Sequence, residues 1–449
     1  MQESPRSPIA VRMIDLAEPL TAMTGLSRYT AVRIFLRRSH RLLGTCDILT
    51  DGVESVSVER LRLAIASDFG TKLFKEELAR TLGAPSPEAA APPGTLAKPL
   101  TVSIIVPTCE RPDDLRRCLQ SVTVQTTRHS VEVIVVDNKP SSPAAATVTR
   151  GFPSVRLVIE SRPGLSYARN AGIAVASGEI IVTTDDDVVA PADWIEKLIE
   201  PFARPDVWGV TGNVLPLELE TESQCQFEIY GGLGKGYKPR EFNQSWFRAQ
   251  RDAPPTWEIG ATANAAFRAH IFRNFAIGLL DEALGAGTPT GCSEDTYLFY
   301  RILKNGGTIV YLPSTYIWHR HRSSMKSLRH QVRSYSKGHV AYHLTTLMRD
   351  GERRALWRLA MLPKVHLQRM WHRLRGWSDY PIPITLIEIA GNFAGPFALW
   401  RSRRRVRRLK PSTRLRSQAP EGDTVGIDSD PEHAHAVPLE SPISQGPTA

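Results

Sequence analysis

Between residues 101 and 203, short apolar runs alternate with stretches of helical periodicity. The apolar runs span residues 102–106, 131–136, 155–159 and 179–183, and the helical stretches begin at Pro112, Tyr167 and Ala192. Nearly continuous apolar strands of this kind are buried on both faces, as in a parallel sheet flanked by helices. The sequence therefore predicts an α/β fold.

Polar residues follow these apolar runs at the points where the strands should end. Thr108 follows the first run, Asp137 follows the second, and Asp185, Asp186 and Asp187 follow the fourth. In open α/β sheets, ligands bind beyond the carboxyl ends of the strands. We therefore expect these side chains to meet at a binding site.

The three consecutive carboxylates constrain the chemistry of that site. Like charges at close range raise one another's pKa unless a cation lies between them. Mn²⁺ and Mg²⁺ favour oxygen ligands and are the simplest such cations. From the residues alone, a solvated acidic turn before the helix near Pro191 remains the alternative.

Several motifs over about residues 101–345 occur in a familiar order. They are VSIIVPT (102–108), VIVVDN (133–138), PGLSYARNAGIAVASGEIIVTTDDD (163–187), GATANAAFR (260–268), GCSEDTYLFYRILKNGG (291–307) and WHRHR (318–322). In this order and spacing the sequence resembles the family 2 glycosyltransferases, which have the GT-A fold and invert the anomeric centre. The resemblance implies a metal-dependent enzyme that uses a nucleotide-diphospho-sugar.

On the donor side, the resemblance assigns five residues to nucleotide-sugar binding: Thr108, Asp137, Arg169, Asp185 and Asp186. The first two match residues that hold the base and ribose, and the third matches a basic residue near the diphosphate. The resemblance assigns the divalent metal, Mn²⁺ or Mg²⁺, to Asp185, Asp187 and His319. The middle carboxylate occupies a variable position of the motif.

On the acceptor side, Glu294 and Asp295 match a pair that opens a helix, and the resemblance makes Asp295 the general base. The alternative is that both acids only complement the helix dipole. His319 is expected after a strand at 308–311 and a turn at Pro313. The glycine-rich stretch 231–236 lacks the Ser or Thr of a phosphate loop and is interpreted as an acceptor-side loop.

The implied reaction is non-processive sugar transfer to a hydroxyl of a lipid-linked or cell-surface glycan precursor. Residues 331–335 only partly match the Q-x-x-R-W motif of processive members. UDP is the expected nucleotide, with dTDP and GDP left open. The alternative function is a non-catalytic nucleotide-sugar-binding protein at the membrane.

The composition divides the chain into five parts. A small N-terminal α+β unit (1–82) is followed by a linker rich in Pro, Ala and Gly (83–100), the GT-A domain (101–345) and a basic aromatic helical segment (346–410). The last part, 411–449, has no aromatic residue and six prolines, which predicts disorder.

The net charge of +10 comes from one region. Residues 320–410 contain 21 Lys or Arg and 4 Asp or Glu, interleaved with tryptophans. The stretch 384–400 is short and polar for a membrane span, which needs about 20 apolar residues, so we expect peripheral binding to an anionic membrane surface. No nucleic-acid-binding module accompanies the charge. Five cysteines without a C-x-x-C pair favour a reducing compartment and a cytoplasmic protein.

Overall fold

A computed structural model describes residues 7–39, 41–83, 96–376 and 381–413 of the chain. Most of the linker expected at 83–100, and all but the first residues of the tail expected at 411–449, lie outside these described residues.

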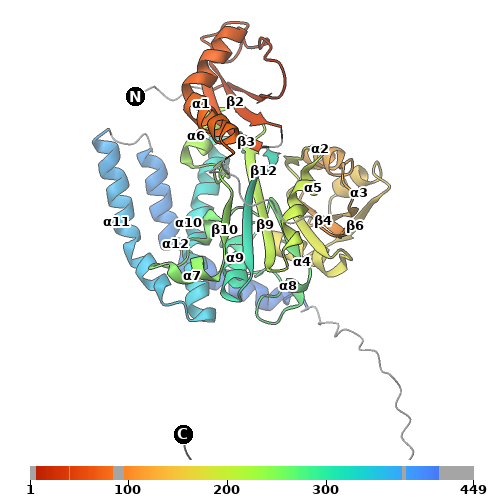
Figure 1. Cartoon of the computed structure of the whole chain (residues 1–449). Coiled ribbons are helices and arrows are strands. Elements are labelled where there is room, and N and C mark those ends of the chain that lie inside the picture. Colours follow the sequence, from red (N-terminus) through yellow and green to blue (C-terminus); the bar gives the residue numbers. More distant parts are fainter. Residues whose placement is uncertain (1–6, 40, 84–95, 377–380, 414–449) are drawn as a thin grey trace, which may run out of the picture. The chain divides into compact units, whose positions relative to one another are not determined.

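A mixed sheet forms the body of the protein (Figure 1). Its strands lie in the order β10-β12-β9-β11-β7-β4-β5-β6, and β8 pairs with β12. The strands β4 to β7 are parallel to one another, β11 is antiparallel to both its neighbours, and β9 is parallel to β12. The bounds are β4 (Thr101–Thr108), β5 (Ser130–Asp137), β6 (Val155–Ile159), β7 (Ile180–Thr184), β8 (Val188–Val189), β9 (Val207–Pro216), β10 (Arg240–Phe242), β11 (Asn264–Arg268) and β12 (Thr308–His319).

The predicted α/β class is confirmed, and the four predicted parallel strands correspond to β4 to β7. The turn expected at Pro313 was wrong, because β12 continues through this residue. The strand absorbs the proline in an irregularity of register between Leu312 and Tyr316. At this irregularity the Thr315 carbonyl accepts a hydrogen bond from Asn264 Nδ2 at 2.8 Å.

Helices cover both faces of the sheet. One face packs on α2 (Pro112–Val122), α3 (Ala144–Thr149) and α5 (Trp194–Ile199). The other packs on α4 (Leu165–Val175), α7 (Gln244–Ala249), α8 (His270–Arg273) and α9 (Glu294–Lys304). Alternation along β4 divides its side chains between the two cores, with Ile104 on the first and Ile105 on the second.

The N-terminal unit is a three-stranded sheet with one long helix. Its elements are β1 (Ile9–Asp15), β2 (Ala31–Arg38), β3 (Arg41–Leu49) and α1 (Val58–Thr81). The Ile9 amide donates to the Leu219 carbonyl at 2.8 Å. The Phe35 ring meets the Trp318 ring edge-on, with centroids 5.5 Å apart. The unit therefore packs directly on the end of β12 and on the segment that follows β9.

Three long helices follow the sheet: α10 (Met325–Asp350), α11 (Arg354–Leu374) and α12 (Ile382–Leu409). The first continues without a break past residue 345. Two glycines let α12 approach α10 closely, because a Cβ on Gly391 would lie 2.6 Å from Ser336 Cβ and one on Gly395 would lie 2.6 Å from Val340 Cβ. One face of α12 is thus packed into the protein.

The opposite side of α12 is apolar and exposed. Leu386, Phe393, Phe397 and Trp400 are 54%, 83%, 60% and 55% exposed. The helix has 28 residues, longer than the stretch 384–400 considered from the sequence. Its length and a mean hydropathy of 1.4 in its most apolar window would suffice for a membrane span, although 39% of that window is buried in the protein.

Candidate active site

Four of the residues expected on the donor side, Thr108, Asp137, Asp185 and Asp186, lie at the carboxyl ends of β4, β5 and β7. Thr108 and Asp137 are neighbours in register across β4 and β5. The Thr108 hydroxyl donates to Asp186 Oδ2 at 2.7 Å, and Asp137 Oδ1 accepts from the Lys139 amide at 2.9 Å. Three of the residues expected to bind the donor, all of them buried, thus form a contiguous group.

The structure also brings together Asp185, Asp187 and His319. One ligand atom from each lies within 4.8 Å of the others. Asp187 Oδ1 is 3.2 Å from His319 Nε2, and this buried oxygen accepts no hydrogen bond within the described part of the chain. Two carboxylates and an imidazole with an unsatisfied oxygen fit a divalent cation.

Arg111 faces the same carboxylates and was not anticipated from the sequence. Its Nη1 lies 2.7 Å from Asp187 Oδ2 and 3.2 Å from Asp186 Oδ1. The available signal was a basic residue directly before Pro112, at the start of the helix that follows β4. Arg111 supplies positive charge to the acidic turn.

The two carboxyl groups that Arg111 contacts titrate in opposite directions. Burial and the charge of Asp187 raise the pKa of Asp186 to about 7. Burial also opposes ionisation of Asp187, but His319 and Arg111 outweigh it and lower the pKa of Asp187. Asp187 is therefore the carboxylate that stays ionised.

A buried arginine on α4 links the residues expected on the donor side to those expected on the acceptor side. Arg169 is 1% exposed, and its Nη2 lies 2.7 Å from Asp185 Oδ1. Its Nη1 lies 2.9 Å from Glu294 Oε1 and donates to the Thr262 hydroxyl at 2.7 Å. One guanidinium thus fixes the spacing between the acidic turn and the start of α9.

The two acids of α9 have different surroundings. Glu294 is buried, and burial together with the charge of Asp295 raises the pKa of Glu294 to about 7. Asp295 is partly exposed, and its Oδ1 accepts from the Thr296 amide at 2.7 Å. Ser293 precedes them in a left-handed conformation with φ of 81°, an uncommon backbone that orients the helix start.

A chain of hydrogen bonds extends behind His319. Its Nδ1 is 3.1 Å from His321 Nδ1, and His321 Nε2 is 2.9 Å from Glu228 Oε1. The carboxylate accepts from Nε2–H, so His321 Nδ1 is the acceptor and His319 Nδ1 the donor; this assignment follows from the network. His319 therefore directs Nε2 toward Asp187, whereas His321 points away from it.

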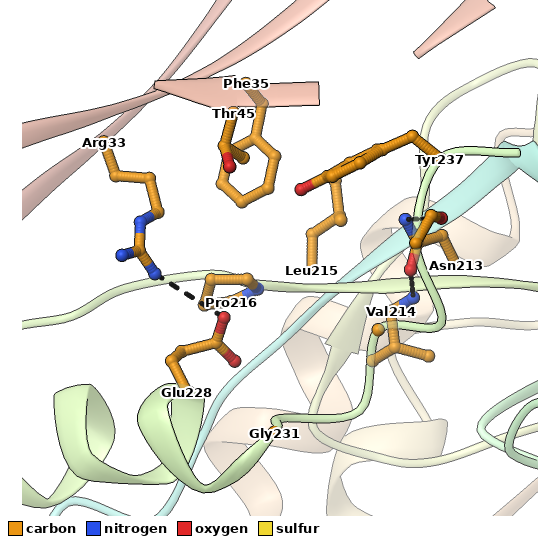
Figure 2. Close-up of a pocket in the computed structure, with 12 residues that line it drawn as sticks. Arg33, Phe35, Thr45, Asn213, Val214, Leu215, Pro216, Glu228, Gly231 and Tyr237 are labelled. Atoms are coloured by element: carbon orange, nitrogen blue, oxygen red, sulfur yellow. Dashed lines mark hydrogen bonds and ion pairs between the residues drawn. The ribbon is translucent and has the colours of Figure 1, made fainter. Parts of the chain in front are cut away.

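The chain of hydrogen bonds from His319 through His321 to Glu228, here called the relay, leads to the N-terminal unit beside a cavity of about 150 Å³ (Figure 2). Arg33 of β2 lies 3.7 Å from the far oxygen of Glu228 and donates to both oxygens of Asp47. The loop 231–236, expected on the acceptor side, contributes Gly231, Gly234 and Gly236 to the cavity wall. Burial lowers the pKa of Lys235, and the charge of Asp295 partly offsets that effect. The loop therefore lies near α9.

Residues 103–275 match the family described as "Glycosyl transferase family 2". The pre-mycofactocin glycosyltransferase of Mycobacterium tuberculosis is 25% identical over 275 residues, which are 59% of this chain and 51% of that protein. Glycosyltransferase AglE of Haloferax volcanii is 32% identical over 118 residues, or 25% of this chain and 39% of that protein. The chain thus spans about half the length, or less, of these relatives.

Among solved structures, the chain is similar to the mannosyltransferase PcManGT from Pyrobaculum calidifontis, determined in complex with GDP-Man and Mn²⁺. The sequence identity is 18% and the TM-score is 0.47, over 74% of this chain and 96% of that one.

Proposed function

This chain belongs to the family 2 glycosyltransferases, and from that premise we propose that it transfers a sugar from a nucleotide-diphospho-sugar to a hydroxyl group. The observation that carries the proposal is the Arg169 bridge, which holds the acidic turn at Asp185 beside the acid pair at Glu294. The bridge thereby joins the acidic turn, proposed to hold the cation that neutralises a departing diphosphate, to the acid pair, proposed to supply the carboxylate that accepts the proton of an attacking hydroxyl.

On the donor side, we propose that Thr108 and Asp137 bind the nucleoside, with UDP as the expected nucleotide. Asp185, Asp187 and His319 would hold Mn²⁺ or Mg²⁺. When bound, the cation neutralises the negative charge that develops on the departing diphosphate. Arg111 occupies Asp187 Oδ2 and leaves Oδ1 for the cation.

On the acceptor side, we propose Asp295 as the general base. Its carboxylate takes the proton of the acceptor hydroxyl while the oxygen forms a bond to the anomeric carbon and the bond from that carbon to the diphosphate breaks. One displacement of this kind inverts the anomeric centre. Glu294 is held by Arg169, so its proposed role is to position the start of α9.

The acceptor is proposed to be a lipid-linked or cell-surface glycan precursor at the cytoplasmic face of the membrane. Support comes from the exposed apolar residues of α12 and from Leu367 and Trp371 of α11, which are 63% and 51% exposed. Apolar side chains next to basic ones bind the interface of anionic bilayers. Phe393→Glu should reduce sedimentation with phosphatidylglycerol vesicles, whereas Phe275→Glu, at an 86% exposed site of the main body, should not.

The donor assignment is tested by thermal unfolding with UDP, dTDP or GDP, each with and without Mn²⁺. One nucleotide should stabilise the wild-type protein in a Mn²⁺-dependent manner, and Asp187→Ala should remove that dependence. Asp113→Ala is the matched control, because the Asp113 side chain is 86% exposed at the start of α2. Undiminished Mn²⁺-dependent stabilisation of Asp187→Ala would refute the metal assignment.

A further inference from the structure

The carboxyl-terminal half of α12 forms one wall of a pocket that the proposed reaction does not use. The pocket has a volume of about 500 Å³, and its opposite wall includes Pro163 and Pro289. Arg401, Arg404, Arg405 and Arg408 line it from the helix. Positions three, four and seven apart share a helix face, so the spacing of these arginines gathers them on one side.

Three of these guanidinium groups have no acidic partner among the described residues. In the part of the chain that the structure describes, no carboxylate forms an ion pair with Arg401, Arg404 or Arg408, whereas Arg403 of the same helix pairs with Asp281 at 2.6 Å. The sequence contains no Asp or Glu from residue 389 to residue 420. Like charges held this close repel, so an anionic ligand would stabilise the arrangement.

Arg405 has a different task. Its Nη1 donates to the Gly287 carbonyl at 2.9 Å, and its Nη2 donates to the Pro163 carbonyl. These contacts fasten the helix to the two loops that close the pocket. The remaining three guanidinium groups are thereby held beside a fixed wall.

Aromatic rings continue the pocket along the helix. The Phe397 and Trp400 rings are stacked, with centroids 5.5 Å apart, and the Arg404 guanidinium lies 5.7 Å from the Trp400 centroid. Both rings are more than half exposed, and exposed Phe393 and Leu386 extend the apolar stripe toward the start of α12. The ligand must therefore offer an anionic group at one end and an apolar chain beside it.

The two loops of the pocket also lead to the candidate active site. Pro163 precedes Gly164. The Gly164 amide donates, at 2.8 Å, to Oδ1 of Asn138, which is the residue directly after Asp137. Pro289 lies five positions before Glu294 in the sequence. The Leu165 amide donates to the Ala286 carbonyl at 2.9 Å, so the two loops are joined. A ligand in the pocket would lie against the outer side of loops whose ends carry donor-side and acceptor-side residues.

We propose that this pocket binds the phosphate or diphosphate group of a lipid, with the lipid chain on the apolar stripe of α12, and so anchors the lipid-linked acceptor. Its role in anchoring the acceptor rests on the proposed transferase function, whereas lipid binding itself does not. A nucleic acid is disfavoured because its phosphates repeat along the strand, whereas the arginines that line this pocket form one cluster that adjoins the exposed rings of Phe397 and Trp400.

The test is calorimetric titration of the full chain, in EDTA, with farnesyl diphosphate, inorganic pyrophosphate and farnesol. Farnesyl diphosphate should bind more tightly than either of the other two, and a large excess of UDP should not displace it. Arg404→Gln and Arg408→Gln together should weaken it by about tenfold or more, from the lost charge-assisted hydrogen bonds. Arg407→Gln is the matched control, because Arg407 is exposed on the same helix outside the pocket.

Three results would overturn the proposal. Equal affinity for pyrophosphate and farnesyl diphosphate would mean that the lipid chain is not recognised. An equal loss in Arg407→Gln would mean a diffuse charge effect, and displacement by a short DNA duplex would mean a nucleic-acid site. The expected binding pattern in a protein that transfers no sugar from any donor would leave the lipid site standing and refute the proposed function instead.

Discussion

Replacing Arg169 by methionine should destabilise the protein strongly, because the guanidinium is the cation shared by two acids. The Arg169 side chain is 1% exposed, as against 7% for Glu294 and 28% for Asp185. Removing one partner of a buried ion pair costs about 3–5 kcal/mol, since the other charge stays buried and uncompensated. Asp185 is partly solvated and should contribute the smaller share. We therefore expect Arg169→Met to lower the free energy of unfolding by about 3–5 kcal/mol at pH 8.

The pH dependence of that loss provides an internal check. Because the pKa of Glu294 is raised to about 7 in the folded protein, above its value in the unfolded chain, the proton binds the folded state more tightly. The stabilisation that comes from protonation of Glu294 is complete below the pKa of this group in the unfolded chain, and it is lost as the pH rises through about 7. Arg169 offsets the cost of the ionised form, so the penalty of Arg169→Met should be larger at pH 8 than at pH 5.5.

The assay is urea unfolding followed by tryptophan fluorescence at both pH values. Arg28→Met is the control, because the Arg28 side chain is 67% exposed in its ion pair with Glu220, and exposed ion pairs contribute little to stability. A loss below 1 kcal/mol for Arg169→Met at pH 8, or a larger loss at pH 5.5 than at pH 8, would refute this account of the bridge.

Three further predictions concern single positions. Asp295→Asn should retain nucleotide affinity in titrations and lower kcat for sugar transfer by about 10² to 10⁴-fold; wild-type kcat would direct attention to Glu294. His321→Leu should weaken Mn²⁺ binding by about 10 to 100-fold, measured by the signal of free Mn²⁺ in electron paramagnetic resonance. His321→Asn, which keeps an acceptor for His319 Nδ1, should weaken it by less. Equal Mn²⁺ affinities of the wild type and both variants would refute the role of the relay. Gly395→Leu should cost about 1–3 kcal/mol in urea unfolding by overpacking α10 against α12, and a neutral effect would contradict their close contact.

The strands that could be predicted from the sequence are those with nearly continuous apolar runs. The strands β4, β5 and β7 supply buried side chains to both cores, so their composition identifies them, whereas the edge strand β6 is only partly buried and is identified by its apolar residues Val155, Leu157 and Val158. The strand β9 was not identified, because Gly209, Gly212 and Asn213 interrupt its apolar residues. Gly212 is required by tertiary contact, since a Cβ there would lie 1.9 Å from the Thr315 carbonyl oxygen. Such a requirement is invisible without the partner strand.

The same distinction applies to the site. The acids of the turn at Asp185 are consecutive in the sequence, and so are Glu294 and Asp295. Each group can therefore be recognised as a motif. The relay behind His319 joins residues that are distant in the chain, with 93 positions between Glu228 and His321. The WHRHR motif alone does not predict which ring nitrogen of either histidine faces the acidic residues. That choice arises only when the fold places a carboxylate behind His321.

The docking of Phe35 on Trp318 has a practical consequence for work with fragments of this protein. Phe35, Leu42, Leu215 and Tyr316 share one apolar cluster, which the Trp318 ring joins from the end of β12. A fragment that begins near residue 100 would lack Phe35 and Leu42. It would therefore expose Leu215, Tyr316 and Trp318 to solvent, and Trp318 is adjacent to His319 in the sequence. Such a fragment would be prone to self-association and would report a weakened candidate metal site for reasons unrelated to the intact protein. Expression boundaries should therefore include the N-terminal sheet.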